Sequence, residues 1–285
     1  MKKFKIIGVI PVRYESIRLP GKALLEIAGK PMIYWVYHHA ARCPLFEQLL
    51  VATDSDLILD YCRSQNIPVM ATGEHRSGSD RLHEVVTRTD GEIYVNIQGD
   101  EPTIRPEHIE LLTAPFSDEE TMVSTLKIEI TAAAAENPNV VKVVTDKRDR
   151  ALYFSRYPIP YNRREAGEAR HYKHIGLYAY RRQALERFHA LDPTPLEQLE
   201  RLEQLRFLEN GIPIQVKETD LETIGVDTPE DLEEVRRIFE QSGTDIKRTS
   251  WFTATGRTLR LLSSSGARFG PTCRVEIRRT SRPAA

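Results

Sequence analysis

Apolar and polar residues alternate in blocks along the first hundred residues of the chain. Short apolar runs that predict buried strands span 6–10, 49–53, 67–71 and 93–98. Between them, more polar segments predict helices over 31–42, 56–65 and 80–88. Strands that alternate with helices at this spacing indicate right-handed βαβ units and a parallel sheet. Pro68 favours a place near the sheet edge for its strand, because proline cannot donate to a ladder of hydrogen bonds.

The pattern changes in the second half of the chain. Further strands are predicted over 122–130, 140–146, 151–156 and 174–180, and an irregular segment rich in Pro, Arg and Tyr spans 156–172. Residues 196–210 predict one amphipathic helix that Gly211 ends. The apolar stripe of this helix consists of Leu196, Leu199, Leu202, Leu205 and Leu208. Thr228 and Pro229 begin a last helix that reaches about Glu240.

Composition narrows the class of protein. The 285 residues are 40% hydrophobic, and the charged residues nearly balance at a net charge of −1, so nothing requires a nucleic-acid or membrane partner. The first residues lead straight into a strand, and no apolar run approaches the roughly 20 residues that span a bilayer. Cys43, Cys62 and Cys273 are scattered and odd in number. We therefore expect a cytoplasmic protein with reduced thiols.

Charge is distributed unevenly along the chain. Residues 241–285 contain nine Lys or Arg and two Asp or Glu, whereas the first 240 residues contain 31 bases and 39 acids. The segment 241–285 is rich in Ser, Thr, Arg and Gly and shows no clear periodicity. This composition predicts a basic tail that is disordered or poorly packed. A nucleic-acid-binding arm is the alternative that we do not favour.

The loop after the first strand carries the strongest chemical signal. It contains Arg13, Arg18 and Lys22 directly after the apolar run 6–10. Ligands of open α/β sheets bind at the carboxyl ends of the strands, and guanidinium and ammonium groups suit phosphate oxygens. We interpret the loop as a cradle for a polyphosphate. Because the loop has no Walker-type or GxGxxG pattern, a solvated basic loop is the alternative interpretation.

Two aspartates lie at predicted junctions between elements. Asp100 follows the strand 93–98, and Asp227 precedes the last helix. If both lie at the same sheet edge as the basic loop, they offer the oxygen ligands that Mg²⁺ shares with substrate phosphates. Each aspartate taken singly also fits a structural role, Asp227 as a helix cap and Asp100 as a turn residue.

Other polar positions give weaker signals. Gly78 would let the backbone approach a flat base, whose edge Ser77 could then read, although the same stretch fits an ordinary helix start. His174 in its alternating strand is typical of a structural histidine, and Glu203 and Gln204 would by default lie on the solvated face of their helix. No Ser-His-Asp, Cys-His or zinc-ligand spacing is present. Nucleotidyl transfer needs none of these, because it relies on positioning and on cations.

Nine short segments across about residues 5–240 carry a family resemblance. They are 11–14 (PVRY), 18–22 (RLPGK), 77–81 (SGSDR), 96–102 (NIQGDEP), 137–142 (NPNVVK), 151–156 (ALYFSR), 174–178 (HIGLY), 202–206 (LEQLR) and 225–229 (GVDTP). In this order they resemble the 3-deoxy-manno-octulosonate cytidylyltransferases, also called CMP-KDO synthetases. Three departures are Ile17, where the family often has a small polar residue, Ser79-Asp80, where Thr-Asp or Thr-Glu is commoner, and the tail, which matches nothing in the family.

The resemblance implies an α/β fold of the Rossmann-like nucleotide-diphospho-sugar transferase type. Its central sheet would be mainly parallel, with helices on both faces. A cytidylyltransferase domain would span 1–240, with a smaller subregion over about 150–210 that contributes to a homodimer. The implied reaction converts CTP and 3-deoxy-D-manno-octulosonate (KDO) to CMP-KDO and pyrophosphate with Mg²⁺, for lipopolysaccharide biosynthesis.

The resemblance also implies roles for individual residues. The catalytic set would be Arg13, Lys22, Asp100 and Asp227, of which Asp100 and Asp227 would hold Mg²⁺. The nucleotide would contact Arg13, Arg18, Lys22, Ser77, Gly78, Arg81 and Gln98. The sugar acid would contact Gln98, His174, Tyr178, Glu203 and Gln204.

Two alternatives remain at this stage. The acceptor could instead be an amino-KDO analogue or another 2-keto sugar acid, such as a nonulosonate. The protein could also be a nucleotide-binding module without catalysis. Retention of both candidate metal carboxylates and of the three loop cations argues against the second alternative, because binding without chemistry would not require all of them.

Overall fold

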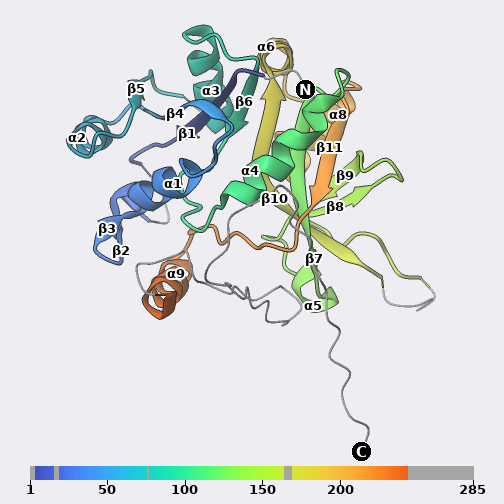
Figure 1. Ribbon diagram of the computed structural model, residues 1–285. Coiled ribbons are helices and arrows are strands. Elements are labelled where there is room, and N and C mark those ends of the chain that lie inside the picture. The colour runs from blue at the N-terminus through green and yellow to red at the C-terminus, as the bar shows by residue number, and fades with distance from the viewer. Residues whose placement is uncertain (1–3, 16–18, 76, 164–168, 243–285) are drawn as a thin grey trace, which may run out of the picture.

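A mixed nine-stranded sheet forms the centre of the molecule (Figure 1). The computed structural model describes residues 4–15, 19–75, 77–163 and 169–242. The main strand order is β11-β7-β10-β6-β1-β4-β5, and β8 and β9 extend it from β10. The strands are β1 (Ile6–Pro11), β4 (Phe46–Thr53), β5 (Val69–Ala71), β6 (Ile93–Asn96), β7 (Val123–Ile130), β8 (Lys142–Thr145), β9 (Ala151–Ser155), β10 (His171–Arg181) and β11 (Ile214–Glu218). A separate small hairpin pairs β2 (Glu26–Ile27) with β3 (Lys30–Pro31).

Most neighbouring strands of the main order run parallel. β6, β1, β4 and β5 form one parallel block, and β11 pairs in parallel with β7. β10 is antiparallel to both of its neighbours, β6 and β7. The prediction of a mainly parallel α/β sheet is therefore confirmed, and so is the edge position of the strand that contains residues 67–71, since β5 ends the order.

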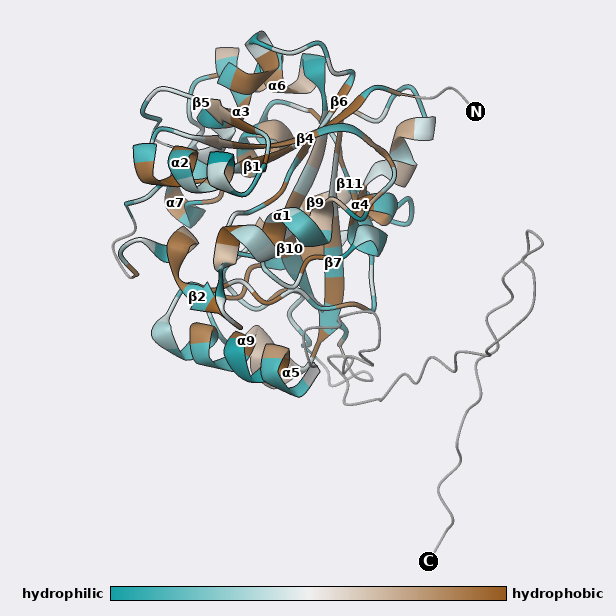
Figure 2. Ribbon diagram, turned by 60° about the vertical axis from the view of Figure 1, so that its left-hand side comes forward, coloured by the Kyte–Doolittle hydropathy of each residue, from teal (hydrophilic) through white to brown (hydrophobic). Residues whose placement is uncertain are grey.

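Helices cover both faces of this sheet, as predicted. They are α1 (Met32–Ala40), α2 (Asp56–Ser64), α3 (Gly78–Thr87), α4 (Pro106–Thr113), α5 (Ala132–Ala135), α6 (Arg182–Ala190), α7 (Pro195–Glu200), α8 (Leu205–Glu209) and α9 (Pro229–Ser242), with 3₁₀ turns η1 (Lys22–Leu24) and η2 (Ala114–Ser117). The sequence pattern had not predicted α4, α6 or β11. Hydrophobic residues gather on the strands and on the inner faces of the helices, while the outer faces of the helices are largely polar (Figure 2).

The strand β1 explains why the core has two halves. Ile6 and Ile10 point into the cluster that α1, α4 and α9 cover, whereas Ile7 and Val9 point into the cluster that α3 and α6 cover. All four side chains are buried. A parallel strand buried on both faces reads as a continuous apolar run, which is the pattern of residues 6–10. The loop after β1 therefore leaves a rigid, fully packed strand.

The prediction of one continuous helix over 196–210 is wrong. The chain forms α7 and α8, and Arg201 between them adopts a left-handed conformation with φ 53°. Glu197 of α7 accepts hydrogen bonds from the Arg206 guanidinium of α8 at 2.5 and 2.7 Å. In a continuous helix these two residues would be separated by about 13.5 Å along the axis, so this pairing requires the break.

Breaking the helix also splits its apolar stripe. Leu202 and Leu205 are buried, but Leu199 is 81% exposed. Glu200 faces inward, where its carboxylate accepts from Ser155 Oγ at 2.7 Å and from the Arg156 backbone N–H at 2.9 Å. The contacts of Glu197 and Glu200 therefore decide the local structure, although the spacing of the leucines favours one continuous helix.

None of the helices within the described ranges combines the length and the hydrophobicity that a bilayer crossing requires. The predicted basic tail, apart from its first two residues, lies outside the described residues. The domain boundary near residue 240 stays a prediction.

A buried histidine on α1 makes the stability of the fold depend on pH. His39 is 4% exposed, and its Nδ1 donates to the backbone oxygen of Pro102 at 2.6 Å. Burial lowers the pKa of His39 to about 4. Because the unfolded chain keeps a histidine pKa near 6.5, it binds the proton first as the pH falls. The native state is therefore favoured fully above about pH 6.5 and progressively less toward pH 4.

We expect a His39→Asn variant to lose this pH dependence, because its side-chain amide keeps an N–H donor but does not titrate. Between pH 7 and pH 5 the wild type should lose about 2 kcal/mol more of its free energy of unfolding than the variant does, given a native pKa of about 4. Urea denaturation at both pH values measures the difference. Equal losses in the two proteins would contradict the assignment.

Candidate active site

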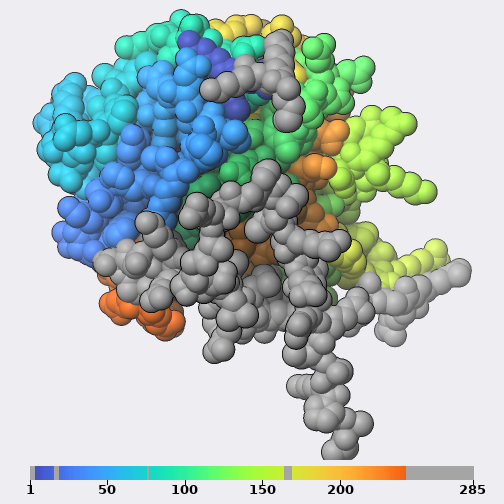
Figure 3. All heavy atoms as spheres, viewed as in Figure 1, coloured from blue at the N-terminus to red at the C-terminus, as the bar shows by residue number. Residues whose placement is uncertain are grey.

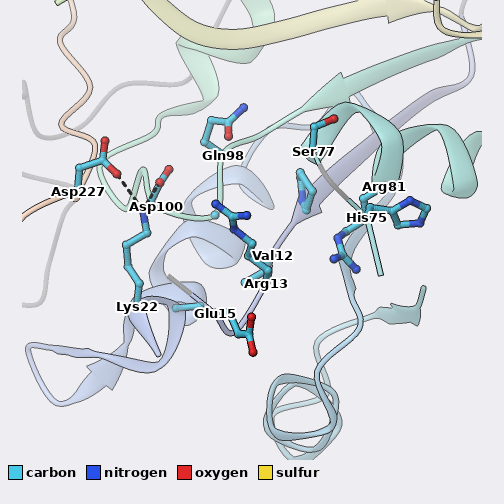
Figure 4. Close-up of a pocket in the computed structure, with 14 residues that line it drawn as sticks. Val12, Arg13, Glu15, Lys22, His75, Ser77, Arg81, Gln98, Asp100 and Asp227 are labelled. Atoms are coloured by element: carbon cyan, nitrogen blue, oxygen red, sulfur yellow. Dashed lines mark hydrogen bonds and ion pairs between the residues drawn. The ribbon is translucent and has the colours of Figure 1, made fainter. Parts of the chain in front are cut away.

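A cavity of about 360 Å³ lies where the parallel strands end (Figure 4). The loop after β1 contributes Arg13 and Glu15, η1 begins with Lys22, the start of α3 contributes Ser77, Gly78 and Arg81, the turn after β6 contributes Gln98 and Asp100, and Asp227 precedes α9. The structure thus brings together every predicted catalytic and nucleotide-contacting residue that it describes. Arg18 lies outside the described residues.

Two glycines allow the loops around this cavity to approach each other. A Cβ atom at Gly99 would lie 2.8 Å from Val12 Cγ2 and 3.2 Å from the Pro11 backbone oxygen, so a side chain would push the turn after β6 away from the end of β1. Gly21 has φ 67°, and its N–H donates to Tyr14 O at 3.2 Å. This turn folds the basic loop back and places Lys22 at the cavity.

Lys22 joins the two aspartates. Its Nζ donates to Asp100 Oδ2 at 2.5 Å and to Asp227 Oδ1 at 3.1 Å, as the dashed lines in Figure 4 show. The cap of α9 is supplied by other groups, because Thr228 Oγ1 accepts from the Asp231 N–H while Asp231 Oδ2 accepts from the Thr228 N–H. Asp227 is therefore not the helix cap that the sequence left open as an alternative.

The carboxylates of Asp100 and Asp227 fit Mg²⁺ only together with further oxygen ligands. One nitrogen contacts both carboxylates, which shows that Asp100 and Asp227 converge on a single cation position. Within the described residues no group of three or more His, Cys, Asp or Glu side chains gathers at a metal position. Mg²⁺ commonly takes one or two carboxylates and completes its shell with phosphate oxygens and water. The pair therefore suits an ion whose remaining ligands are water and phosphate oxygens.

A buried carboxyl that sequence analysis overlooked lies next to this pair. Glu101 is 7% exposed. Burial, followed by repulsion from Asp100, raises the pKa of Glu101 to about 7. Its place directly after Asp100 in the Gly-Asp-Glu-Pro turn was the available signal.

The start of α3 forms the opposite side of the cavity. Ser77 Oγ accepts from the Asp80 N–H at 3.2 Å and so caps the helix, which confirms the helix-start interpretation of this stretch. Arg81 is 3% exposed, and its guanidinium pairs with Asp54 at 2.7 Å and donates to Gly73 O at 3.2 Å. The charge of Arg81 is therefore largely compensated, whereas Arg13 is exposed at the cavity.

A second cavity, of about 400 Å³, adjoins the first, because Gln98 lines both. All five residues predicted to contact the sugar acid line this second cavity: Gln98, His174, Tyr178, Glu203 and Gln204. Glu203 and Gln204 do not lie on a solvated helix face. They occupy the segment between α7 and α8, where Gln204 is buried and Glu203 accepts from Ser79 Oγ at 2.6 Å.

A bulge in β10 shapes one wall of the second cavity. The register with β7 shifts between Ile175 and Tyr178, and bulges of this kind re-aim side chains near functional sites. Thr125 Oγ1 bonds His174 Nε2 at 3.0 Å and also reaches backbone oxygens within the bulge. Gln98 Nε2 donates to Gly176 O at 3.2 Å. Burial lowers the pKa of His174 to about 3, so the ring is a neutral hydrogen-bonding group.

Three buried polar atoms of the second cavity have no hydrogen-bond partner within the described part of the chain. They are the acceptor Asn96 Oδ1, the hydroxyl of Tyr178 and the donor Gln204 Nε2. A buried polar group without a partner costs about 1–3 kcal/mol, so a ligand rich in hydroxyl groups would satisfy all three. The sequence motifs did not predict a role for Asn96. Its signal was a single polar residue inside the otherwise apolar strand 93–97.

The chain matches the family model described as Cytidylyltransferase over residues 7–224. It therefore belongs to the cytidylyltransferases, a class of transferases, and the alternative of a module without catalysis is not supported.

Within that class the chain belongs to the 3-deoxy-manno-octulosonate cytidylyltransferase family. It is 49% identical over 239 residues to the family member from Acidobacterium capsulatum, covering 84% of this chain and 98% of that one. It is also 49% identical over 235 residues to the member from Koribacter versatilis, covering 82% and 90%. A solved CMP:2-keto-3-deoxy-manno-octonic acid synthetase complexed with CTP superimposes with a TM-score of 0.81 at 46% identity, covering 84% of this chain and all of that one.

The close approach at Gly99 leads to a testable expectation. In a Gly99→Ala variant, the added methyl group should displace the turn that carries Gln98 and Asp100, because the Pro11 backbone oxygen cannot move aside. We expect the free energy of unfolding to fall by about 1–3 kcal/mol and CTP binding to weaken. Urea denaturation and calorimetric titration measure the two effects. Gly73→Ala is the matched control, since its Cβ would meet only Glu84 Oε2 at 3.8 Å, and equal behaviour of both variants would refute the steric argument.

Proposed function

We propose that this protein transfers the CMP group of CTP to KDO and releases pyrophosphate, supplying CMP-KDO for lipopolysaccharide biosynthesis. The observation that carries the proposal is the pair of adjoining cavities that share Gln98. One offers cations and two convergent carboxylates, and the other offers unsatisfied neutral polar groups. Membership of the cytidylyltransferase family supports the reaction. It also supports the assignment of the nucleotide to the charged cavity and of the sugar acid to the neutral one.

In the proposed complex the triphosphate of CTP lies in the first cavity, beside Arg13 and Lys22. Arg18 belongs to the same loop and would add a third cation. The cytosine base lies against the start of α3, where Gly78 leaves room because a Cβ there would meet only Pro11 at 3.6 Å. The fixed pairing of Arg81 with Asp54 keeps this wall rigid without adding a strong net charge.

KDO lies in the second cavity in this proposal. Its hydroxyl groups would satisfy the open acceptor of Asn96 and the open donor of Gln204, and Tyr178 and the neutral ring of His174 line the same space. Glu203 is held in place by Ser79 and would accept from a sugar hydroxyl. Gln98, at the junction, would orient the reacting end of the sugar toward the nucleotide.

The reaction then needs little covalent chemistry from the protein. The anomeric hydroxyl of KDO attacks the α-phosphorus of CTP in line, a new P–O bond forms, the bond to the β-phosphate oxygen breaks, and pyrophosphate leaves while the hydroxyl proton is lost to solvent. Arg13 and Lys22 stabilise the charge on the transferring and leaving phosphates. When bound by Asp100 and Asp227, Mg²⁺ would neutralise further charge and align the reactants. Since both substrates are anionic, the cations also limit their mutual repulsion.

We also propose that the protein acts in the cytoplasm as a homodimer. Seven large hydrophobic side chains of the described residues are exposed, and four of them belong to the subregion 150–210: Leu152, Tyr157, Tyr161 and Leu199. The segments of β8 and β9 project from the rest of the molecule (Figure 3). Of the four residues, Leu152 lies on β9, and large apolar side chains left exposed in one subregion are typical of a surface that a partner covers.

The proposed reaction predicts a selective release of pyrophosphate. With KDO as acceptor, release should be fastest with CTP and much slower with UTP, ATP or dTTP. With CTP, KDO should exceed amino-KDO analogues and nonulosonates. A coupled pyrophosphate assay across this panel tests both choices, and a faster rate with another acid would replace KDO by that acid.

The same assay tests the metal. Chelation of Mg²⁺ should stop release, and Asp100→Asn should lower the rate by about a hundredfold or more. Near-normal turnover of the variant at limiting Mg²⁺ would remove the metal-binding role of Asp100.

The proposed dimer predicts that charge in its interface separates the subunits. Leu152→Asp and Leu199→Asp should weaken dimerisation at least about thirtyfold, the cost of losing a central apolar contact. Leu57→Asp is the control, because Leu57 is 56% exposed on α2, outside the subregion. Analytical ultracentrifugation gives the dissociation constants, and a monomeric wild type would end the proposal.

A further inference from the structure

Lys22 holds the carboxylates that are proposed to bind the metal. Its Nζ lies 2.5 Å from Asp100 Oδ2 and 3.1 Å from Asp227 Oδ1, and its side chain is only 17% exposed. The contacts span 78 and 205 positions of the chain. Without a counter-ion, two carboxylates this close together would repel each other. The ammonium group therefore supplies the positive charge that the pair requires when no metal is bound.

The same ammonium group is needed elsewhere when the nucleotide is bound. Lys22 and Arg13 line the same cavity, and the triphosphate requires cations that are free to contact it. An ammonium group that donates to two carboxylates has most of its charge compensated. It therefore attracts a phosphate weakly until those carboxylates acquire another cation.

The geometry gives the lysine freedom to change partners while its backbone stays in place. The backbone of Lys22 is held by the turn at Gly21 and by the Leu25 N–H, which donates to Lys22 O at 3.1 Å. The side chain beyond Cα is a flexible four-carbon stem that carries a compact charge. Rotation about its own bonds would move Nζ within the first cavity, which Lys22 lines together with Arg13 and both aspartates.

We propose that Lys22 is the resident counter-ion of Asp100 and Asp227, that it competes with the divalent metal for them, and that its charge becomes available to the nucleotide phosphates only when the metal displaces it. The inference rests on the proposed function, because it takes these aspartates as metal ligands. It assigns the lysine two successive partners. It also makes metal binding and nucleotide binding mutually reinforcing, since each ligand removes a competitor of the other.

A permanent structural ion pair is the competing explanation. In that case Lys22 would only tie the turn after β6 to the segment before α9, and its removal would loosen the aspartates and weaken metal binding. Competition predicts that removal of the lysine strengthens metal binding, because the metal then has one competitor fewer for the two carboxylates. The direction of the change in metal affinity therefore separates the two explanations.

The test measures binding of Mn²⁺ alone to the nucleotide-free protein by electron paramagnetic resonance. Lys22→Met and Lys22→Gln should each bind Mn²⁺ about tenfold more tightly than the wild type, the scale expected for removing a partly exposed competing ion pair. Lys30→Met, on the exposed hairpin strand β3 outside the cavity, should leave the affinity unchanged. Asp100→Asn should abolish binding in both the wild-type and the Lys22→Met backgrounds. Circular dichroism and urea denaturation confirm that each variant is folded.

Calorimetric titration with CTP supplies a second measurement. In the wild type, a divalent cation should tighten CTP binding more than it does in Lys22→Met, because only the wild type has a lysine to release. Equal enhancement in the two proteins would contradict the exchange of partners.

The outcomes distinguish this inference from the proposed function. Unchanged or weaker Mn²⁺ binding in both folded Lys22 variants overturns the competition, and so does the absence of Mn²⁺ binding in every protein. If pyrophosphate is still released from CTP and KDO in these cases, the proposed function stands. Tighter Mn²⁺ binding in the Lys22 variants without pyrophosphate release from any acid in the wild type would support the competition and refute the function.

Discussion

Electrostatic balance between one lysine and two aspartates is the constraint on which the site depends. Lys22, Asp100 and Asp227 come from the loop after β1, the turn after β6 and the segment before α9. The two aspartate charges repel each other, and the charge of Lys22 compensates them. Their contact marks the point where three segments distant in the sequence meet at one edge of the sheet, and this is the edge where we propose that the nucleotide binds.

Tight packing holds the residues at that edge of the sheet in fixed positions. β1 is buried on both faces, and Gly99 lets the turn after β6 lie against the end of β1. Gln98 precedes this glycine and lines both cavities. The first and second cavities are therefore held by the same few residues, and displacement of that turn would disturb both. Positioning of this kind is the main contribution that a protein makes to nucleotidyl transfer.

The shape of the second cavity depends on one irregularity in β10 and one at the end of α7. The bulge in β10 directs His174 toward Thr125 and leaves Gly176 O to Gln98. The left-handed residue Arg201 ends α7 early, which turns Gln204 into the cavity. A regular strand and a continuous helix would have pointed these groups elsewhere. Local irregularity is thus the means by which a common fold forms the second cavity, in which we propose that the sugar acid binds.

The sequence by itself determined the α/β class, the positions of the parallel strands β1, β4, β5 and β6, and the cations and carboxylates of the first cavity, because strand periodicity and polar residues at strand ends are local signals. Through their family resemblance the motifs also identified five residues of the second cavity: Gln98, His174, Tyr178, Glu203 and Gln204. Only the tertiary structure decided that the helix over 196–210 breaks, since the pairing of Glu197 with Arg206 cannot be seen in the periodicity of the leucines. It alone showed that Thr228 and not Asp227 caps α9, that Glu101 is buried beside the aspartates, and that Asn96 faces the acceptor cavity. These outcomes depend on contacts between segments far apart in the chain, whose energies a local pattern does not contain.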